Sequence, residues 1–275
     1  MQVKGVSVPD WLYGTAWKED ATESLVKGAL AAGFRGIDTA NQRKHYYEEG
    51  AGRGIARAGV PRDELFLQTK FTFRGGQDDR LPYDPDAPIA QQVAQSHARS
   101  LEHLGVERVD SLILHGPSQH DGLGAADHEA WRALEALHHA GAVSLIGISN
   151  VTAAQVDDLA AFAEVAPAFV QNRCYASRGW DADVRAACDA HGIRYQAFSL
   201  LTANRDALAQ LGVRRIATAH RVTPAQIVFR FAQQVGMLPL TGTRSATHMR
   251  EDLAIGAIEL SAEELAAIRT AGAAS

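Results

Sequence analysis

The segment Ser111-Leu-Ile-Leu-His115, the amphipathic stretch His128–Ala140 and the segment Ser144-Leu-Ile-Gly-Ile-Ser149 together decide the fold class. Both short segments are continuous apolar runs, which is the pattern of strands buried on both faces of a parallel sheet. The stretch between them has helical spacing of apolar residues. Strand, helix and strand in this order predict a βαβ unit with a crossover helix.

The same alternation extends in both directions along the chain. The expected strands are Trp11–Gly14, Gly36–Asp38, Leu65–Lys70, Ser111–His115, Ser144–Ser149, Phe169–Gln171, Arg194–Ser199 and Leu238–Thr241. The expected helices include Ala21–Ala32, Ile89–Leu104, His128–Ala140, Ala153–Glu164, Asp181–His191, Pro224–Val235 and a final one near Ala262–Thr270. About eight units in 275 residues, without a linker, fit one barrel. We therefore expect an α/β fold, a single (β/α)8 TIM barrel domain over residues 1–275.

Local signals support these boundaries. Glycines just before expected strands are typical of the left-handed residue that ends a helix; they are Gly33, Gly105, Gly141, Gly192 and Gly236. Thr152 with Gln155 three residues later resembles a capping box.

Composition narrows the class of protein. A net charge of −5 argues against a nucleic-acid partner or an anionic membrane surface, and no apolar run approaches the length of a membrane span. The N-terminus lacks the apolar core of a signal peptide, so we expect a cytoplasmic protein. The two cysteines, Cys174 and Cys188, are expected to be reduced and buried, and they lack the neighbours of a metal site.

Polar residues end several of the apolar strands: Asp38, Lys70, His115, Ser149 with Asn150, and Gln171 with Asn172. Each alone could be structural, for example as a helix cap. Parallel strands point the same way, so these side chains should converge on one rim, where barrel enzymes place their chemistry. A lysine there needs a partner, and Asp38 is the candidate. Beside a tyrosine, such an ammonium lowers the phenol pKa and favours proton donation to a carbonyl oxygen.

The longest interruption, Arg74–Pro88, follows the third strand and is rich in Gly, Asp and Pro. It is either a lid over the active face or a tolerated surface insertion.

Taken together, the motifs resemble the aldo-keto reductases over almost the whole chain. The segments that carry the resemblance are Gly-Thr-Ala-Trp-Lys (14–18), Gly-Phe-Arg-Gly-Ile-Asp-Thr-Ala (33–40), Leu-Gln-Thr-Lys (67–70), Ile-Leu-His-Gly-Pro (113–117), Ile-Gly-Ile-Ser-Asn (146–150), Val-Gln-Asn (170–172) and the stretch 242–253. The resemblance implies a catalytic Asp-Tyr-Lys-His tetrad, in which Asp38, Lys70 and His115 match directly.

The assignment of the tyrosine of the tetrad to a residue of this chain is less direct. In most relatives it stands about five residues after the aspartate, where this chain has Arg43. The loop Asn41–Tyr47 looks like the family loop with a small insertion, which makes Tyr46 the favoured acid and Tyr47 the next candidate. Gap-free alignment back from Gly52 would instead place His45 there.

The resemblance also implies a nicotinamide cofactor. Ser149, Asn150 and Gln171 match the residues that hold its carboxamide, and Phe198 replaces a stacking tyrosine, with Ser199 and Leu201 following it. Thr243, Arg244 and Ser245 suit a 2′-phosphate, while Gly242, His248 and Asp252 depart from the residues usual at their positions. NADPH is therefore expected, with NADH possible. No early Gly-x-Gly-x-x-Gly indicates a Rossmann site.

The expected activity is reduction of an aldehyde or ketone to an alcohol, with a small-molecule carbonyl substrate and a monomeric or homodimeric protein. The short tail and Gly116 suggest an open pocket, and Trp17 is a candidate wall. Two alternatives stay open. One is a barrel lyase with Lys70 as Schiff-base nucleophile. The other is a nicotinamide-binding regulatory subunit.

Overall fold

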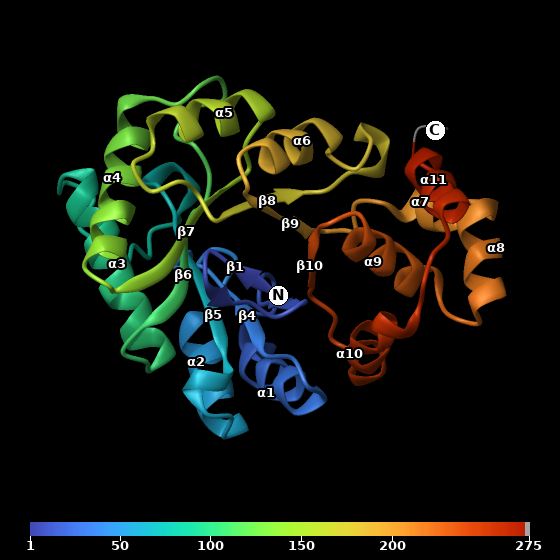
Figure 1. Cartoon of the computed structure of the whole chain (residues 1–275). Helices are drawn as coiled ribbons and strands as arrows, with labels where there is room; N and C mark the ends of the chain where they lie inside the picture. The colour runs from blue at the N-terminus through green and yellow to red at the C-terminus, as the bar shows by residue number, and fades with distance from the viewer. Residues whose placement is uncertain (273–275) are drawn as a thin grey trace.

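Alternating strands and helices close into a (β/α)8 barrel in the computed structural model, which describes residues 1–272 (Figure 1). The barrel strands are β3 (Leu12–Gly14), β4 (Gly36–Asp38), β5 (Phe66–Phe71), β6 (Val109–Leu114), β7 (Val143–Ser149), β8 (Phe169–Arg173), β9 (Arg194–Phe198) and β10 (Leu238–Thr241). Neighbouring strands are parallel throughout, and β10 pairs with β3 to close the ring. The predicted fold class is confirmed.

Helices surround the barrel (Figure 1). They are α1 (Thr22–Ala32), α2 (Glu48–Ala58), α3 (Ile89–Leu104), α4 (Ala125–His139), α5 (Ala153–Phe162), α6 (Ala182–Ala190), α7 (Arg205–Ala209), α8 (Leu211–His220), α9 (Pro224–Gln234), α10 (Ala246–Leu253) and α11 (Ala262–Thr270). The expected helices match within a few residues. Helix α2 was not predicted, because Gly50, Gly52 and Gly54 lower the helix propensity of its sequence. Gly52 is needed there: a Cβ would lie 2.2 Å from the carbonyl oxygen of His103 in α3.

The predicted helix ends are also confirmed. The five glycines Gly33, Gly105, Gly141, Gly192 and Gly236 all have positive φ. Thr152 accepts a hydrogen bond from the backbone of Gln155, and the Gln155 side chain completes the capping box.

The interior of the barrel is layered, because alternate residues of each strand point inward. The lower layer is apolar and includes Leu12, Phe66, Ile113, Phe169 and Leu238. A two-stranded hairpin, β1 (Gln2–Val3) with β2 (Val6–Ser7), contributes Val3 to the same cluster. The layer above it is polar and buried. Its residues are Asp38, Gln68, Lys70, Ser111, Gln171 and Gln196.

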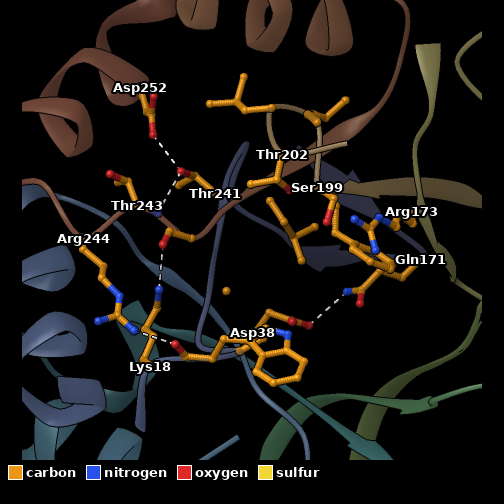
Figure 2. Close-up of a pocket in the computed structure, with 18 of the residues that line it drawn as sticks. Lys18, Asp38, Gln171, Arg173, Ser199, Thr202, Thr241, Thr243, Arg244 and Asp252 are labelled. Carbon is orange, nitrogen blue, oxygen red and sulfur yellow. Dashed lines mark hydrogen bonds between the residues drawn. The ribbon is translucent and has the colours of Figure 1, made fainter. Parts of the chain in front are cut away.

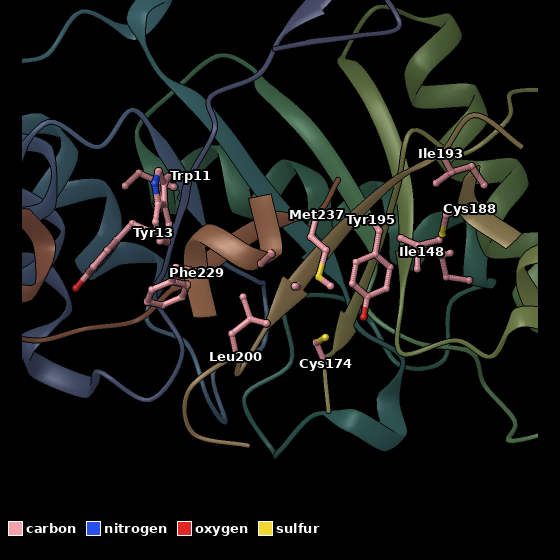
Figure 3. Close-up of a cluster of buried hydrophobic side chains, with 14 of the residues drawn as sticks. Trp11, Tyr13, Ile148, Cys174, Cys188, Ile193, Tyr195, Leu200, Phe229 and Met237 are labelled. Atoms are coloured by element: carbon pink, nitrogen blue, oxygen red, sulfur yellow. The ribbon is translucent and has the colours of Figure 1, made fainter. Parts of the chain in front are cut away.

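A second apolar core lies between the barrel and its helices (Figure 3). It contains Trp11 against Phe229, with ring centroids 4.8 Å apart. Cys174 and Cys188 belong to this core, and both are free and buried, as expected. Within the described part of the chain, no helix combines the length and apolar content needed to cross a membrane.

The 74–88 segment is anchored against the barrel. The Tyr83 hydroxyl donates to the carbonyl of Thr72 at 2.8 Å, and the Gln77 amide donates to the carbonyl of Asn41 at 2.9 Å. Arg80, Leu81 and Pro82 line a side cavity of about 350 Å³ behind Tyr46. No residue of this segment lines the large cavity described below.

Gly147 should be intolerant of a side chain. An alanine Cβ would lie 2.6 Å from the carbonyl oxygen of Phe169 and 2.7 Å from Cδ1 of Ile113. We expect Gly147→Ala to lower the free energy of unfolding by about 1–3 kcal/mol, because strands β7 and β8 must shift. Gly28 in α1 has open space around it, so Gly28→Ala should raise stability by about 0.5–1 kcal/mol. Urea unfolding measures both, and equal stability of the two variants would contradict the packing argument.

Candidate active site

A cavity of about 700 Å³ opens at the carboxyl ends of the barrel strands (Figure 2). Its lining contains thirteen of the expected site residues: Asp38, Tyr46, His115, Ser149, Asn150, Gln171, Phe198, Ser199, Leu201, Thr243, Arg244, His248 and Asp252. The structure therefore brings together side chains from widely separated parts of the chain. Lys70 lies beneath the cavity floor, and Ser245 lies outside the lining.

Asp38 and Lys70 form a buried ion pair in the floor. The Lys70 ammonium lies 2.7 Å from both carboxylate oxygens of Asp38 and donates to the carbonyl of Thr39 at 2.8 Å. Lys70 is 0% exposed and Asp38 2%. Burial lowers the pKa of Lys70, while Asp38 acts in the opposite direction. All three ammonium hydrogens are engaged, which fixes the lysine in place.

His115 presents a neutral imidazole to the cavity. Burial, and secondarily the Lys70 charge, hold the pKa of His115 well below its usual range. Its Nδ1 lies 2.7 Å from the Thr72 hydroxyl. When Thr72 donates to Nδ1, the other ring nitrogen carries the proton and can donate to an oxygen in the cavity.

The three candidates for the tyrosine position have different surroundings. Tyr46 lines the cavity, with its ring 5.8 Å from the His115 ring and 5.2 Å from the Lys70 ammonium. Tyr47 lies outside the lining and packs between the guanidinium groups of Arg43 and Arg53. His45 lines the cavity but stacks on Trp17, with centroids 4.0 Å apart. Tyr46 alone thus combines a phenol with proximity to Lys70 and His115.

The expected lowering of the phenol pKa by Lys70 is not seen. Desolvation of the hydroxyl, and then the Asp38 carboxylate, raise the pKa of Tyr46 above its ordinary value. Lys70 is already engaged by Asp38 and Thr39. The phenol is therefore protonated at neutral pH, which is the form that can donate a proton.

One end of the cavity is lined by amides and an aromatic ring. Asn150 has left-handed backbone geometry (φ 58°), and its amide donates to the carbonyl of His115 at 2.7 Å. The Ser149 hydroxyl donates to the carbonyl of Gln171 at 2.6 Å. Phe198 follows in β9 and faces the cavity. Asn172, the other polar residue at the end of β8, points away and holds the backbone of Val151.

The opposite end carries positive charge and hydroxyl groups. The Arg244 guanidinium donates to the carbonyl of Trp17 at 2.6 Å (Figure 2). The Ser245 hydroxyl caps α10 by accepting from the backbone of His248, so it has a structural contact of its own. Asp252 accepts from the Thr241 hydroxyl at 2.8 Å, and burial raises the pKa of Asp252 to about 6.

Two lining cations were not foreseen as site residues. Lys18 is 2% exposed and donates to the carbonyl of Gly242 at 2.7 Å. Burial, and secondarily Arg244, lower the pKa of Lys18 to about 8. Arg173 is exposed at the end of β8. The sequence signal for Lys18 was its place at the end of the Gly-Thr-Ala-Trp-Lys motif. The signal for Arg173 was its spacing: it follows Gln171 by two residues in a strand and so lies on the same inward face.

A barrel with this rim is the architecture of a carbonyl oxidoreductase, and comparison with known proteins agrees. The model of the Aldo/keto reductase family matches residues 5–273. The chain is 33% identical over 247 residues to an aldo-keto reductase of Mycolicibacterium vanbaalenii, covering 90% of this chain and 81% of the relative. It is 30% identical over 264 residues to a glyoxal reductase of Bacillus subtilis, covering 95% and 88%.

The crystal structure of an aldo/keto reductase from Brucella melitensis superposes with a TM-score of 0.83 at 26% identity, covering 98% of each chain. The chain therefore belongs to the aldo-keto reductase family, whose members are oxidoreductases of carbonyl compounds that use a nicotinamide cofactor.

Removing one partner of the Asp38–Lys70 pair should destabilise the fold more than expected from the loss caused by removing both partners together. Asp38→Leu or Lys70→Met alone leaves one buried charge unpaired, with an expected loss of about 3–5 kcal/mol in unfolding free energy. The double variant leaves neither charge and should lose less than the sum of the two. Urea unfolding of the three variants tests this, and strictly additive losses would contradict it.

Proposed function

We propose that this protein is an NADPH-dependent reductase of aldehydes or ketones, in which Tyr46 is the general acid. The observation that carries the proposal is that Tyr46 and His115 line a single cavity beside the buried Asp38–Lys70 pair. Residues 1–275 would act as one domain, which the continuous ring of strands from 12 to 241 supports. The cytoplasm is the location proposed for it.

The lining fits a nicotinamide dinucleotide phosphate. The amide groups of Asn150 and Gln171, with the face of Phe198, suit a flat aromatic amide at one end. Lys18, Arg244 and the Thr243 hydroxyl suit phosphate groups at the other end. The N-terminus of α10 lies in the same region and adds a favourable dipole for an anion. The positive end favours NADPH, and NADH remains the alternative cofactor.

When bound, the cofactor supplies the hydride for the carbonyl carbon. Tyr46 donates its proton to the carbonyl oxygen, and neutral His115 donates a hydrogen bond to the same oxygen and orients it. Lys70, held by Asp38, places a positive charge beside the phenolate that remains. Ser149, Asn150 and Gln171 hold the ring end of the cofactor, while Trp17 and His45 form one wall of the substrate end.

A Schiff-base role for Lys70 fits the geometry poorly. The lysine is absent from the cavity lining, and its ammonium is bound by three oxygen contacts. A nucleophilic lysine must instead be neutral and accessible. A regulatory role without chemistry would not require Tyr46 to lie beside His115 and Lys70.

The first experiment measures loss of NADPH absorbance with an aromatic aldehyde and with glyoxal, beside the same assays with NADH. Clear turnover with preference for NADPH is expected. Tyr46→Phe should lower kcat about 100-fold or more, because the proton donor is lost, while the Kd for NADPH stays within about twofold. Tyr47→Phe is the matched control and should retain activity. An active Tyr46→Phe variant would refute the acid assignment; tight NADPH binding without turnover would favour a regulatory subunit.

Cofactor affinity should depend on pH through Lys18. Because burial lowers the pKa of Lys18 to about 8, its charge is lost as the pH rises through that value. The Kd for NADPH should therefore increase as the pH rises through about 8. Lys18→Met should raise the Kd about tenfold or more at neutral pH, from loss of a charged hydrogen bond, and should flatten the pH dependence. Fluorescence titration measures both, and an unchanged pH profile in the variant would contradict this role.

A further inference from the structure

Three glutamines and an aspartate form a closed hydrogen-bond network in the barrel centre, below the cavity floor. Gln68 and Gln171 each donate to Asp38, and Gln196 bonds both of these glutamines; Ser111 donates to Gln68 at the edge. We call this set the glutamine network. Gln68 and Gln196 are 0% exposed, so water cannot replace their partners.

The polarity of the network is fixed at Asp38. A carboxylate only accepts hydrogen bonds, so every amide that contacts it must present its NH2 group. Gln68 does so at 2.7 Å and Gln171 at 3.0 Å, both to Oδ1. Lys70 donates to both oxygens, so both carboxylate oxygens act as acceptors in this network.

The orientation of the Gln68 amide in turn fixes the orientation of the Gln196 amide. The Gln68 amide nitrogen also donates to Oε1 of Gln196 at 2.8 Å, and the Gln196 nitrogen donates back to Oε1 of Gln68 at 3.0 Å. Ser111 donates to the same Gln68 oxygen at 3.0 Å. Reversal of any one amide would place two donors or two acceptors face to face.

The consequence falls on Gln171, whose side chain reaches the cavity. Its amide nitrogen donates to Asp38, as Figure 2 shows, and also to Oε1 of Gln196 at 2.9 Å, so both hydrogens are in use. Its Oε1 has no donor among residues 1–272. Gln171 therefore offers the cavity an acceptor and no donor.

We propose that Gln196, acting through Gln171, makes this site selective for a cofactor ring that bears a hydrogen-bond donor, namely a primary carboxamide. This inference rests on the proposed function. Gln196 is a positioning residue: it occupies the second N–H of Gln171 and so withholds that donor from the ligand. A ring bearing an acetyl group, which only accepts, leaves Oε1 of Gln171 without a partner in a buried site.

The test measures Kd values for NADP⁺ and for its 3-acetylpyridine analogue by quenching of tryptophan fluorescence, which needs no turnover. The two ligands differ only in NH2 against CH3. Wild type should bind NADP⁺ about tenfold more tightly, as expected for one hydrogen bond and one buried unpaired acceptor. In Gln196→Leu the Gln171 amide keeps Asp38 as its one remaining acceptor. It is then free to turn about this contact and present its second N–H to the acetyl oxygen, so the preference should fall to about twofold.

Gln68→Leu is the matched control. Gln68 has the same residue type and the same burial as Gln196 and belongs to the same network, but among residues 1–272 no hydrogen bond joins it to Gln171. Both acceptors of the Gln171 amide remain in this variant, so the tenfold preference should persist. A general loosening of the barrel centre would weaken both ligands alike in either variant and leave the ratio unchanged.

Gln171→Met removes the acceptor itself and should abolish the preference, which keeps the test valid if Gln196→Leu does not fold. Equal binding of the two ligands by wild type, or full preference in Gln196→Leu or in Gln171→Met, overturns the inference while leaving the cofactor assignment intact. Failure of wild type to bind either dinucleotide overturns the proposed function and this inference together.

Discussion

The ion pair between Asp38 and Lys70 is the constraint on which the rest of the site depends. Two opposite charges buried at the centre of a barrel must be matched by surrounding groups, because burial removes almost all of their contact with water. Their partners are drawn from β5 and β8 as well as from the backbone after β4. The pair therefore joins separate strands and fixes which atoms face the cavity.

The layering of the barrel follows from the same constraint. Apolar side chains fill the lower interior, and amides fill the level at which the charges lie. Amides are suited to this level because each can donate and accept, so the polarity imposed by the carboxylate can be matched across the barrel. Above this level, the strand ends supply the groups that line the cavity.

The fold could be predicted because its sequence signals are local. Apolar runs mark the strands, glycines with positive φ end the helices, and the capping box of Thr152 and Gln155 begins a helix. Asp38, Lys70 and His115 could be placed because strand ends converge in any barrel. The raised pKa of Tyr46 and the contact of Lys18 with Gly242 could not be predicted, because each depends on partners that are distant in sequence. The capping role of Ser245 was missed because the same hydroxyl also suited a phosphate. Helix α2 was obscured by glycines needed for packing against α3.

Trp17 links the two ends of the cavity. Its backbone carbonyl holds the Arg244 guanidinium, its backbone N–H donates to the carbonyl of His45 at 2.7 Å, and its ring stacks on His45. Arg244 cannot give its full set of donors to a phosphate while one of them is bound to this loop. The guanidinium has five N–H donors and this contact uses one, so the others can meet an anion while the loop stays attached. The positive end of the cavity and the wall formed by Trp17 and His45 are therefore held by one backbone segment.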